Sequence, residues 1–149
     1  MWPVLIGGAA LLFAGAALSR RAKQRAAVAG LRREFPRIAR MRLVAACPSL
    51  EGVIDEAMLR RVFDWMLIEM FRRAGVSSFG ELMRWSVKQG EVETAWLAVQ
   101  VTDEAARNLP LPVRSEIDRC GAGIMTSVIL NDALTEAGQR ISPELEQYV

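Results

Sequence analysis

The sequence predicts an all-α protein with one N-terminal transmembrane helix, a basic connector helix and a small bundle of about five helices. Three observations lead to this fold class: an uncharged apolar run at the N-terminus, a change in the sign of the charge after residue 42, and apolar residues at helical spacing from residue 48 onward. We therefore expect a transmembrane anchor at residues 1–18, a basic juxtamembrane helical connector at residues 19–47 and a helical domain at residues 48–149.

The N-terminal run, Trp2–Leu18, has no charged side chain over seventeen residues. As a helix it would be about 25 Å long, which is the short end of what a bilayer core requires. Basic residues follow the run instead of preceding it, which is the order of an uncleaved signal anchor and not of a secretory signal peptide. Because basic residues stay on the non-translocated side, we expect an integral, single-pass membrane protein whose C-terminal body lies on the cytoplasmic face, or on the matrix or cytosolic face in an organelle.

One face of this run carries small residues at helical spacing. They are Gly7, Ala10, Ala14 and Ala17. Small side chains let a second transmembrane helix approach closely, so we expect this face to dock onto other membrane-protein subunits. The alternative is that glycine and alanine are simply frequent in membrane spans.

The connector is strongly basic. Up to Arg42 the chain has nine basic residues and one acidic residue, and beyond it ten basic and sixteen acidic residues. Anionic lipid headgroups are the expected partners of this segment, whereas acidic proteins come second and nucleic acid is the least favoured partner. The candidate lipid contacts are Arg20, Arg21, Lys23, Arg25, Arg32, Arg33 and Arg37, with Arg40 and Arg42 beyond them.

An apolar stripe also runs along the connector. It consists of Val28, Leu31, Phe35 and Ile38, which are spaced for one face of a helix. Pro36 lacks an N–H group and clashes with the preceding helical turn. We therefore expect one helix from about Ser19 to Glu34 and a second helix that begins at Pro36.

The body begins with a long helix, predicted from Ile54 to Ala74, whose wide apolar stripe makes it the centre of the core. The methionines of this stripe, Met58, Met66 and Met70, are expected to fill the core; an adaptable binding groove is the alternative. Gly75 is expected to end the helix, and Ser78 followed by Glu81 has the spacing of a capping box that starts the next one. That helix is expected to stop near Gly90.

Two further helices are expected. The first spans Glu91–Asn108, with Val92, Trp96 and Val99 facing inward. The second, after Pro110 and Pro112, is a long helix from Val113 through Leu134, interrupted only by Gly121 and Gly123. Gly138 is expected to close this helix, and Ser142–Glu144 to open a short terminal turn.

Few residues are suited to catalysis. The chain has no histidine, which is the commonest general base and metal ligand, and we expect no cofactor, no metal and no enzymatic activity. Cys47 and Cys120 are 73 positions apart and belong to no paired motif, so they are expected to be buried thiols in a reducing compartment and not a disulfide. The glycines at 121 and 123 lack the context of a phosphate loop; we expect them to let Trp85 or Trp96 pack closely.

Residues 79–102 resemble a single tetratricopeptide repeat. The matching positions are Phe79, Leu82, Gly90, Val92, Ala95 and Val99. Gly90 stands where that family turns between its two helices, and Ala95 where a small residue lets them pack together. Met83, Ser86 and Thr102 depart from the family pattern.

The layout of the whole chain resembles the family of twenty-kilodalton import receptors of the mitochondrial outer membrane, which bind amphipathic presequences in an apolar groove. The resemblance consists of an N-terminal anchor, a basic segment, one repeat-like helix pair and the turn at Leu109–Val113. The long helix Ile54–Ala74 and the short spacing from Gly90 to Pro110 depart from that family.

These expectations favour a membrane-anchored, non-catalytic adaptor or accessory subunit of a multi-protein membrane complex. The alternative is a membrane-tethered receptor that binds a helical peptide between the Gly90 hairpin and the Ile54 helix. A membrane-associated enzyme is the least favoured hypothesis, because no pocket with converging polar groups is evident from the sequence.

Overall fold

A computed structural model describes residues 21–146. This part of the chain contains helices, turns and no β-strand, which confirms the all-α prediction. The helices are α2 (Arg21–Ala46), α3 (Glu56–Ala74), α4 (Phe79–Gln89), α5 (Glu91–Arg107), α6 (Leu111–Arg119) and α7 (Thr126–Glu146), with short 3₁₀-helices η1 (Pro48–Gly52) and η2 (Gly123–Met125).

The predicted anchor lies outside the described residues. The same holds for Gly7, Ala10, Ala14, Ala17 and Arg20. Across residues 21–146, every helix falls short of the length or apolar character that a membrane span requires.

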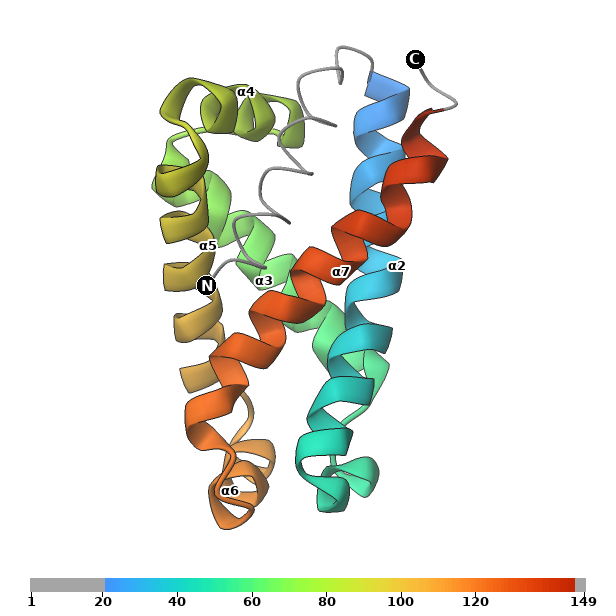
Figure 1. Ribbon diagram of the computed structural model, residues 1–149, viewed down its shortest axis with the longest axis vertical. Helices are drawn as coiled ribbons and strands as arrows, with labels where there is room; N and C mark the ends of the chain where they lie inside the picture. Colours follow the sequence, from blue (N-terminus) through green and yellow to red (C-terminus); the bar gives the residue numbers. More distant parts are fainter. Residues whose placement is uncertain (1–20, 147–149) are drawn as a thin grey trace.

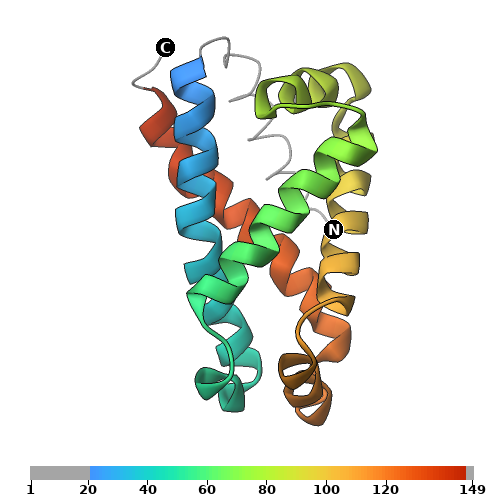
Figure 2. The same cartoon turned by 180° about the vertical axis from the view of Figure 1, so that it is seen from behind.

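Two helices stand at the sides of the bundle, and two others cross between them on opposite faces. Helices α2 and α5 stand on two sides of the molecule, and α7 crosses diagonally between them on one face (Figure 1). Helix α3 crosses on the opposite face, as the view from behind shows (Figure 2). Both α2 and α5 contact both α3 and α7, so each crossing helix joins the two sides of the bundle.

Helix α2 belongs to the same hydrophobic core as the rest of the body. Phe35 and Ile38 have no solvent exposure, and the rings of Phe35 and Phe63 on α3 lie 5.7 Å apart between centroids. Leu31 and Leu43 join the same cluster, which extends through Leu59 on α3 to α7. The segment expected to be a connector is therefore a central helix of the bundle.

The predicted break at Pro36 is wrong, because α2 continues through it to Ala46. A proline inside a helix costs about 3 kcal/mol, since it removes one backbone hydrogen bond and crowds the preceding turn. Burying a large apolar side chain contributes about 1.5–3 kcal/mol, and Phe35, Ile38 and Leu43 on this helix are all buried. Tertiary packing thus outweighs the local preference against a helix.

The predicted ends of α3 and α4 are confirmed. The Asp55 carboxylate accepts a hydrogen bond from the Met58 N–H at 2.7 Å and caps the start of α3. Gly75 ends α3 with a φ of 70°, a left-handed conformation that glycine adopts without steric cost. The Ser78 hydroxyl accepts from the Glu81 N–H at 3.2 Å, while the Glu81 carboxylate accepts from the N–H of Ser77. These caps fix where α3 stops and where α4 starts.

The long helix expected over Val113–Leu134 is two helices. Helix α6 stops at Arg119, where the N–H groups of Gly121 and Ala122 donate to the carbonyls of Asp118 and Ile117 at 3.0 Å. Gly121 adopts a φ of 72° and has open space around its α-carbon, so it is a turn residue and not a surface against which a tryptophan packs.

The predicted end at Gly138 is also wrong. Gly138 is buried inside α7, and the helix continues through Pro143 to Glu146. Ile141 and Leu145, which follow Gly138, are both buried against the core. The apolar stripe of α7 therefore extends beyond the glycine and keeps the last two turns helical.

The two cysteines form a disulfide, so the expectation of free buried thiols is wrong. Cys47 follows α2 and Cys120 follows α6, with their α-carbons 5.8 Å apart. The Ser49 hydroxyl donates to the Glu116 carboxylate at 2.7 Å beside the bond. The disulfide thereby ties η1 to the end of α6, two segments that the sequence separates by 73 positions.

Replacing both cysteines by serine should destabilise the protein by about 2–4 kcal/mol, because a long loop regains its freedom in the unfolded chain. The measurement is chemical unfolding of the oxidised wild type and the double variant, followed by circular dichroism. The control is the wild type under reducing conditions, which should behave like the variant. An unchanged unfolding midpoint in both cases would show that the disulfide constrains nothing.

Gly30→Ala should destabilise the protein by about 1–2 kcal/mol, since overpacking outweighs the better helix propensity of alanine. A Cβ at position 30 would lie 2.8 Å from the γ2 methyl and 3.3 Å from the Cβ of Ile141. Ile141 is β-branched and has little rotamer freedom in a helix. Gly52→Ala is the control, because its added methyl meets no atom within 4 Å. Equal unfolding midpoints for the two variants would contradict a tight crossing of α2 and α7.

Candidate functional site

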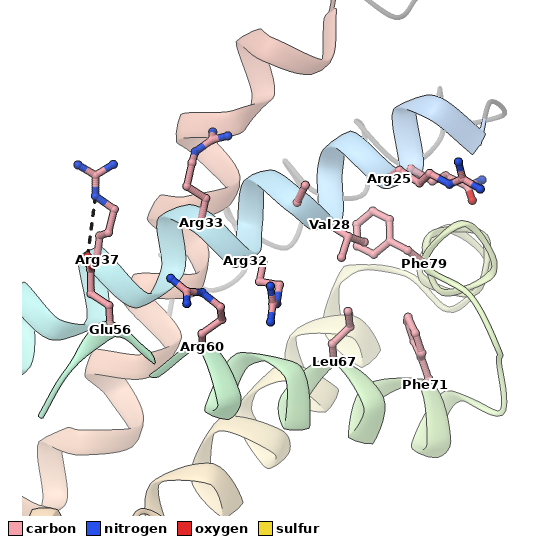
Figure 3. Close-up of a pocket in the computed structure, with 12 residues that line it drawn as sticks. Arg25, Val28, Arg32, Arg33, Arg37, Glu56, Arg60, Leu67, Phe71 and Phe79 are labelled. Atoms are coloured by element: carbon pink, nitrogen blue, oxygen red, sulfur yellow. Dashed lines mark ion pairs between the residues drawn. The ribbon is translucent and has the colours of Figure 1, made fainter. Parts of the chain in front are cut away.

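A groove lies between α2 and α3 and is closed at one end by α4 (Figure 3). Its volume is about 1050 Å³. The lining residues divide into a basic group and an apolar group. The basic group is Arg25, Arg32, Arg33, Arg37 and Arg60, and the apolar group is Val28, Ala29, Leu67, Phe71 and Phe79; Gln24 and Glu56 complete the lining.

Two arginines from different helices extend into the space between α2 and α3. Arg32 comes from α2 and Arg60 from α3 (Figure 3). Arg32 makes a two-pronged ion pair with Asp64, with nitrogen to oxygen distances of 2.9 and 3.1 Å. The hydrogen bond with Asp64 raises the pKa of Arg32. Arg60 makes no hydrogen bond or ion pair with any residue in the described range 21–146.

The remaining arginines of this end are held by acids to different degrees. Arg33 turns toward α7 and pairs with both oxygens of Glu144, at 2.9 and 3.0 Å, and these bonds raise its pKa. Arg37 lies 4.0 Å from Glu56, the limit of an ion pair. Arg25, near α4 at the other end, has no ion-pair partner within residues 21–146. Arg25 and Arg60 are therefore the two cations of the groove that a ligand finds uncompensated.

The apolar end of the groove lies where α2, α3 and α4 meet. Four apolar side chains lie together there: Val28, Leu67, Phe71 and Phe79 (Figure 3). Arg32, Arg33, Arg37 and Arg60 lie toward the opposite end of the groove. Gly80 of α4 faces Gln24 of α2: a Cβ at position 80 would lie 2.2 Å from the side-chain amide nitrogen of Gln24, at the end of a flexible side chain. The groove thus has one cationic half and one apolar half.

The structure brings four of the predicted lipid contacts into this groove: Arg25, Arg32, Arg33 and Arg37. Arg21 is exposed at the start of α2 and does not line the groove, whereas Lys23 is buried and does not present its side chain on that surface.

Arg40 and Arg42 are bonded to other parts of the bundle and do not line the groove. Arg40 donates to the carbonyls of Ile54 and Glu51, and Arg42 pairs with Glu136 at 3.3 Å. Sequence reasoning missed Arg60, because nothing in the local pattern tells which face of α3 meets α2.

A second surface lies on α5, opposite to the face in the core. Val92, Trp96 and Val99 were expected to face inward, and that prediction is wrong: their exposed fractions are 74%, 59% and 36%. The buried residues of α5 are Ala95, Leu97, Val101, Thr102 and Ala105. We call the surface made by Val92, Trp96 and Val99 the α5 outer face. Helix α5 is apolar on two faces, and α3 and α7 cover only one of them.

A small apolar pocket lies between α3, α4, α5 and α7, with a volume of about 70 Å³. Met66 and Met70 on α3, Met83 on α4 and Ala95 on α5 are among its lining residues, and Asn131 on α7 adds a polar group. Gly90 makes the turn between α4 and α5 with a φ of 93°. A groove for a helical peptide between the Gly90 hairpin and the Ile54 helix stays a prediction, and the structure has a pocket of about 70 Å³ between α3, α4, α5 and α7.

Several acidic residues outside the groove cap helices or form ion pairs. Asp55 caps α3, Asp103 pairs with Arg107 at 3.0 Å, and Glu69 pairs with Arg72 and Arg73. In residues 21–146, no three cysteine or acidic side chains come together as a metal would require.

No protein-family model, curated protein or solved structure matches this chain.

Glu69 should titrate well below an ordinary glutamate. Hydrogen bonds from Arg72 and Arg73 lower its pKa from 4.5 to about 2, and Arg73 also bonds Glu104, which joins α3 to α5. Because the folded pKa is depressed, this stabilising contribution is present above about pH 4.5 and is lost as the pH falls toward 2. Carboxyl ¹³C NMR measures the midpoint, and Glu69→Gln should remove the signal. A Glu69 midpoint near 4.5 would show that the arginines do not hold it.

Proposed function

We propose that this chain is a membrane-anchored, non-catalytic adaptor or accessory subunit that binds a partner protein through its helical body. The observation that carries the proposal is the α5 outer face. A helix that packs one apolar face into a core normally turns charged or polar residues outward. Helix α5 instead exposes Val92, Trp96 and Val99 at helical spacing, which is the pattern of a helix that is covered on both sides.

The partner we propose for this face is an amphipathic helix with basic flanks, belonging to another subunit. Helix-in-groove and helix-on-helix recognition reads apolar anchors at this spacing. Tryptophan is among the residues that contribute most to interfaces when they become buried. Glu91 and Glu93 are exposed beside Val92 and make no ion pair within residues 21–146, so basic residues on the partner would complement them.

The membrane part of the proposal rests on residues 1–18 and on the arginines that follow them. Helix α2 begins at Arg21, three positions after Leu18, the last residue of the apolar run. The basic residues favour a body on the cytoplasmic or matrix side. The Cys47–Cys120 disulfide favours an oxidising compartment, because such bonds rarely persist in reducing ones. We give precedence to the order of the charges and propose the cytoplasmic or matrix side. Proteolysis of the C-terminus in intact and in opened membranes tests this orientation. Thiol alkylation of the same samples tests whether the Cys47–Cys120 disulfide is formed there.

A second candidate function is a receptor that binds a peptide at the Gly90 hairpin, as in the repeat-containing import receptors that the layout resembles. The small apolar pocket beside α4 and α5 supports it, since Met66, Met70 and Met83 line this pocket and methionine side chains adapt readily to the shape of a neighbour. The two candidates place the partner on opposite faces of α5. Ala95 is in the pocket and Trp96 is on the outer face, so neighbouring substitutions separate them.

Trp96→Ser should dissociate the partner, with a loss of affinity of about tenfold or more, which is what losing an interface tryptophan costs. Native gel electrophoresis of the full chain after mild detergent extraction reports the complex. Ile68→Ser is the matched control, because Ile68 is exposed to a similar degree on α3 and lies off this face. A wild-type chain that migrates as a lone monomer would refute the adaptor. If Ala95→Leu dissociates the complex and Trp96→Ser does not, the receptor candidate holds.

A further inference from the structure

We propose that the groove between α2 and α3 binds one anionic membrane lipid, with its headgroup among the arginines and part of an acyl chain along the apolar half. The inference deepens the membrane part of the proposed function and rests on it. It names a ligand class and a site, where the sequence indicates only a general attraction between arginines and headgroups.

The cationic half is suited to a phosphate-bearing headgroup. Arg32 and Arg60 enter it from two helices, so an anion placed between them is held from both sides (Figure 3). Asp64 compensates Arg32 through a two-pronged pair, and no acid in residues 21–146 bonds to Arg60. Adjacent guanidinium groups repel each other unless a negative charge lies near both, and a bound phosphate would supply that charge.

The apolar half distinguishes a lipid from a simple anion. Val28, Leu67, Phe71 and Phe79 come from three helices and continue the groove away from the arginines. From Arg37 to Arg25 the groove follows α2 for twelve residues, which is about 18 Å at the rise of an α-helix. A headgroup and the upper part of one chain fit that length, and a free phosphate would leave the apolar half empty.

The position of the groove along the chain places it near a bilayer surface. Arg25 lies seven residues after Leu18, the last residue of the predicted anchor. Seven residues reach at most about 25 Å even when fully extended. The apolar end of the groove is therefore held within reach of the headgroup layer, and the cationic end lies farther along α2.

The arrangement favours a lipid over nucleic acid. Nucleic acid presents phosphates at regular spacing and binds grooves that are positive along their whole length, with aromatic rings on which bases stack. Here four of the five arginines gather in one half, and Phe71 and Phe79 lie apart from them (Figure 3). An acidic amphipathic peptide has the same two kinds of group, and the experiment below includes it as a competitor.

The test uses the full chain in nanodiscs and measures binding of a fluorescent phosphatidylglycerol, in discs of phosphatidylcholine alone. Arg60→Gln should weaken binding about fivefold, which is the effect of losing one basic residue near an anionic lipid. Arg60 lies in the cationic half and lacks an ion-pair partner in the described chain, so the fold should not change. Arg61→Gln is the matched control, since Arg61 is exposed on the same helix outside the groove.

The outcomes separate the ligand classes. Displacement of the label by unlabelled phosphatidylglycerol, with little effect of inorganic phosphate, supports a lipid site. Equal displacement by inorganic phosphate would overturn it in favour of a simple anion site, and stronger displacement by an acidic amphipathic peptide would overturn it in favour of a peptide groove. Equal affinities of the Arg60→Gln variant and its Arg61→Gln control would also overturn it. Trp96→Ser should keep lipid binding, so failure of the partner proposal is distinguishable from failure of this one.

Discussion

The structure depends on the tight crossing of α2 and α7, which joins the beginning of the described chain to its end. Gly30 allows the approach, since Ile141 occupies the space that a side chain would fill. Ion pairs lie on both sides of the crossing: Arg33 with Glu144 and Arg140 with Glu34. Because α2 is held in this way, its other side is free to pack on α3, and the groove between them exists as a consequence.

The charge asymmetry of the sequence is largely used inside the molecule. The basic first third of the chain folds back onto acidic residues of α3 and α7, as in the pairs of Arg32 with Asp64 and Arg42 with Glu136. Exposed pairs of this kind stabilise a fold only slightly, so they orient helices more than they hold them. In the cationic half of the groove, Arg60 is the arginine that no acid of residues 21–146 pairs with, and neither counting charges nor locating the basic segment identifies it.

Helix ends that capping residues determine were predictable from the sequence, whereas features that depend on tertiary packing were not. Asp55, Gly75 and Ser78 act on the backbone within three or four residues, so their helix ends were predictable. Pro36 and Gly138 lie inside helices because buried residues farther along extend them. The arginines that α2 contributes to the cationic half of the groove were predictable from the sequence. The contribution of Arg60 was not, because it depends on which face of α3 meets α2. The Cys47–Cys120 pair was not predictable either, because 73 positions of chain separate the cysteines.

The exposure of Trp96 shows that apolar residues at helical spacing can lie on the face of a helix that points away from the core. On α5 two apolar stripes compete for the core, and the one with small residues, Ala95 and Ala105, is buried because it lets α3 and α7 approach closely. The bulkier stripe is left for solvent or for a partner. Helices α5 and α2 stand on different sides of the bundle (Figures 1 and 2). A lipid held beside α2 would therefore leave the α5 outer face accessible, so that one small domain could face a membrane and a partner at the same time.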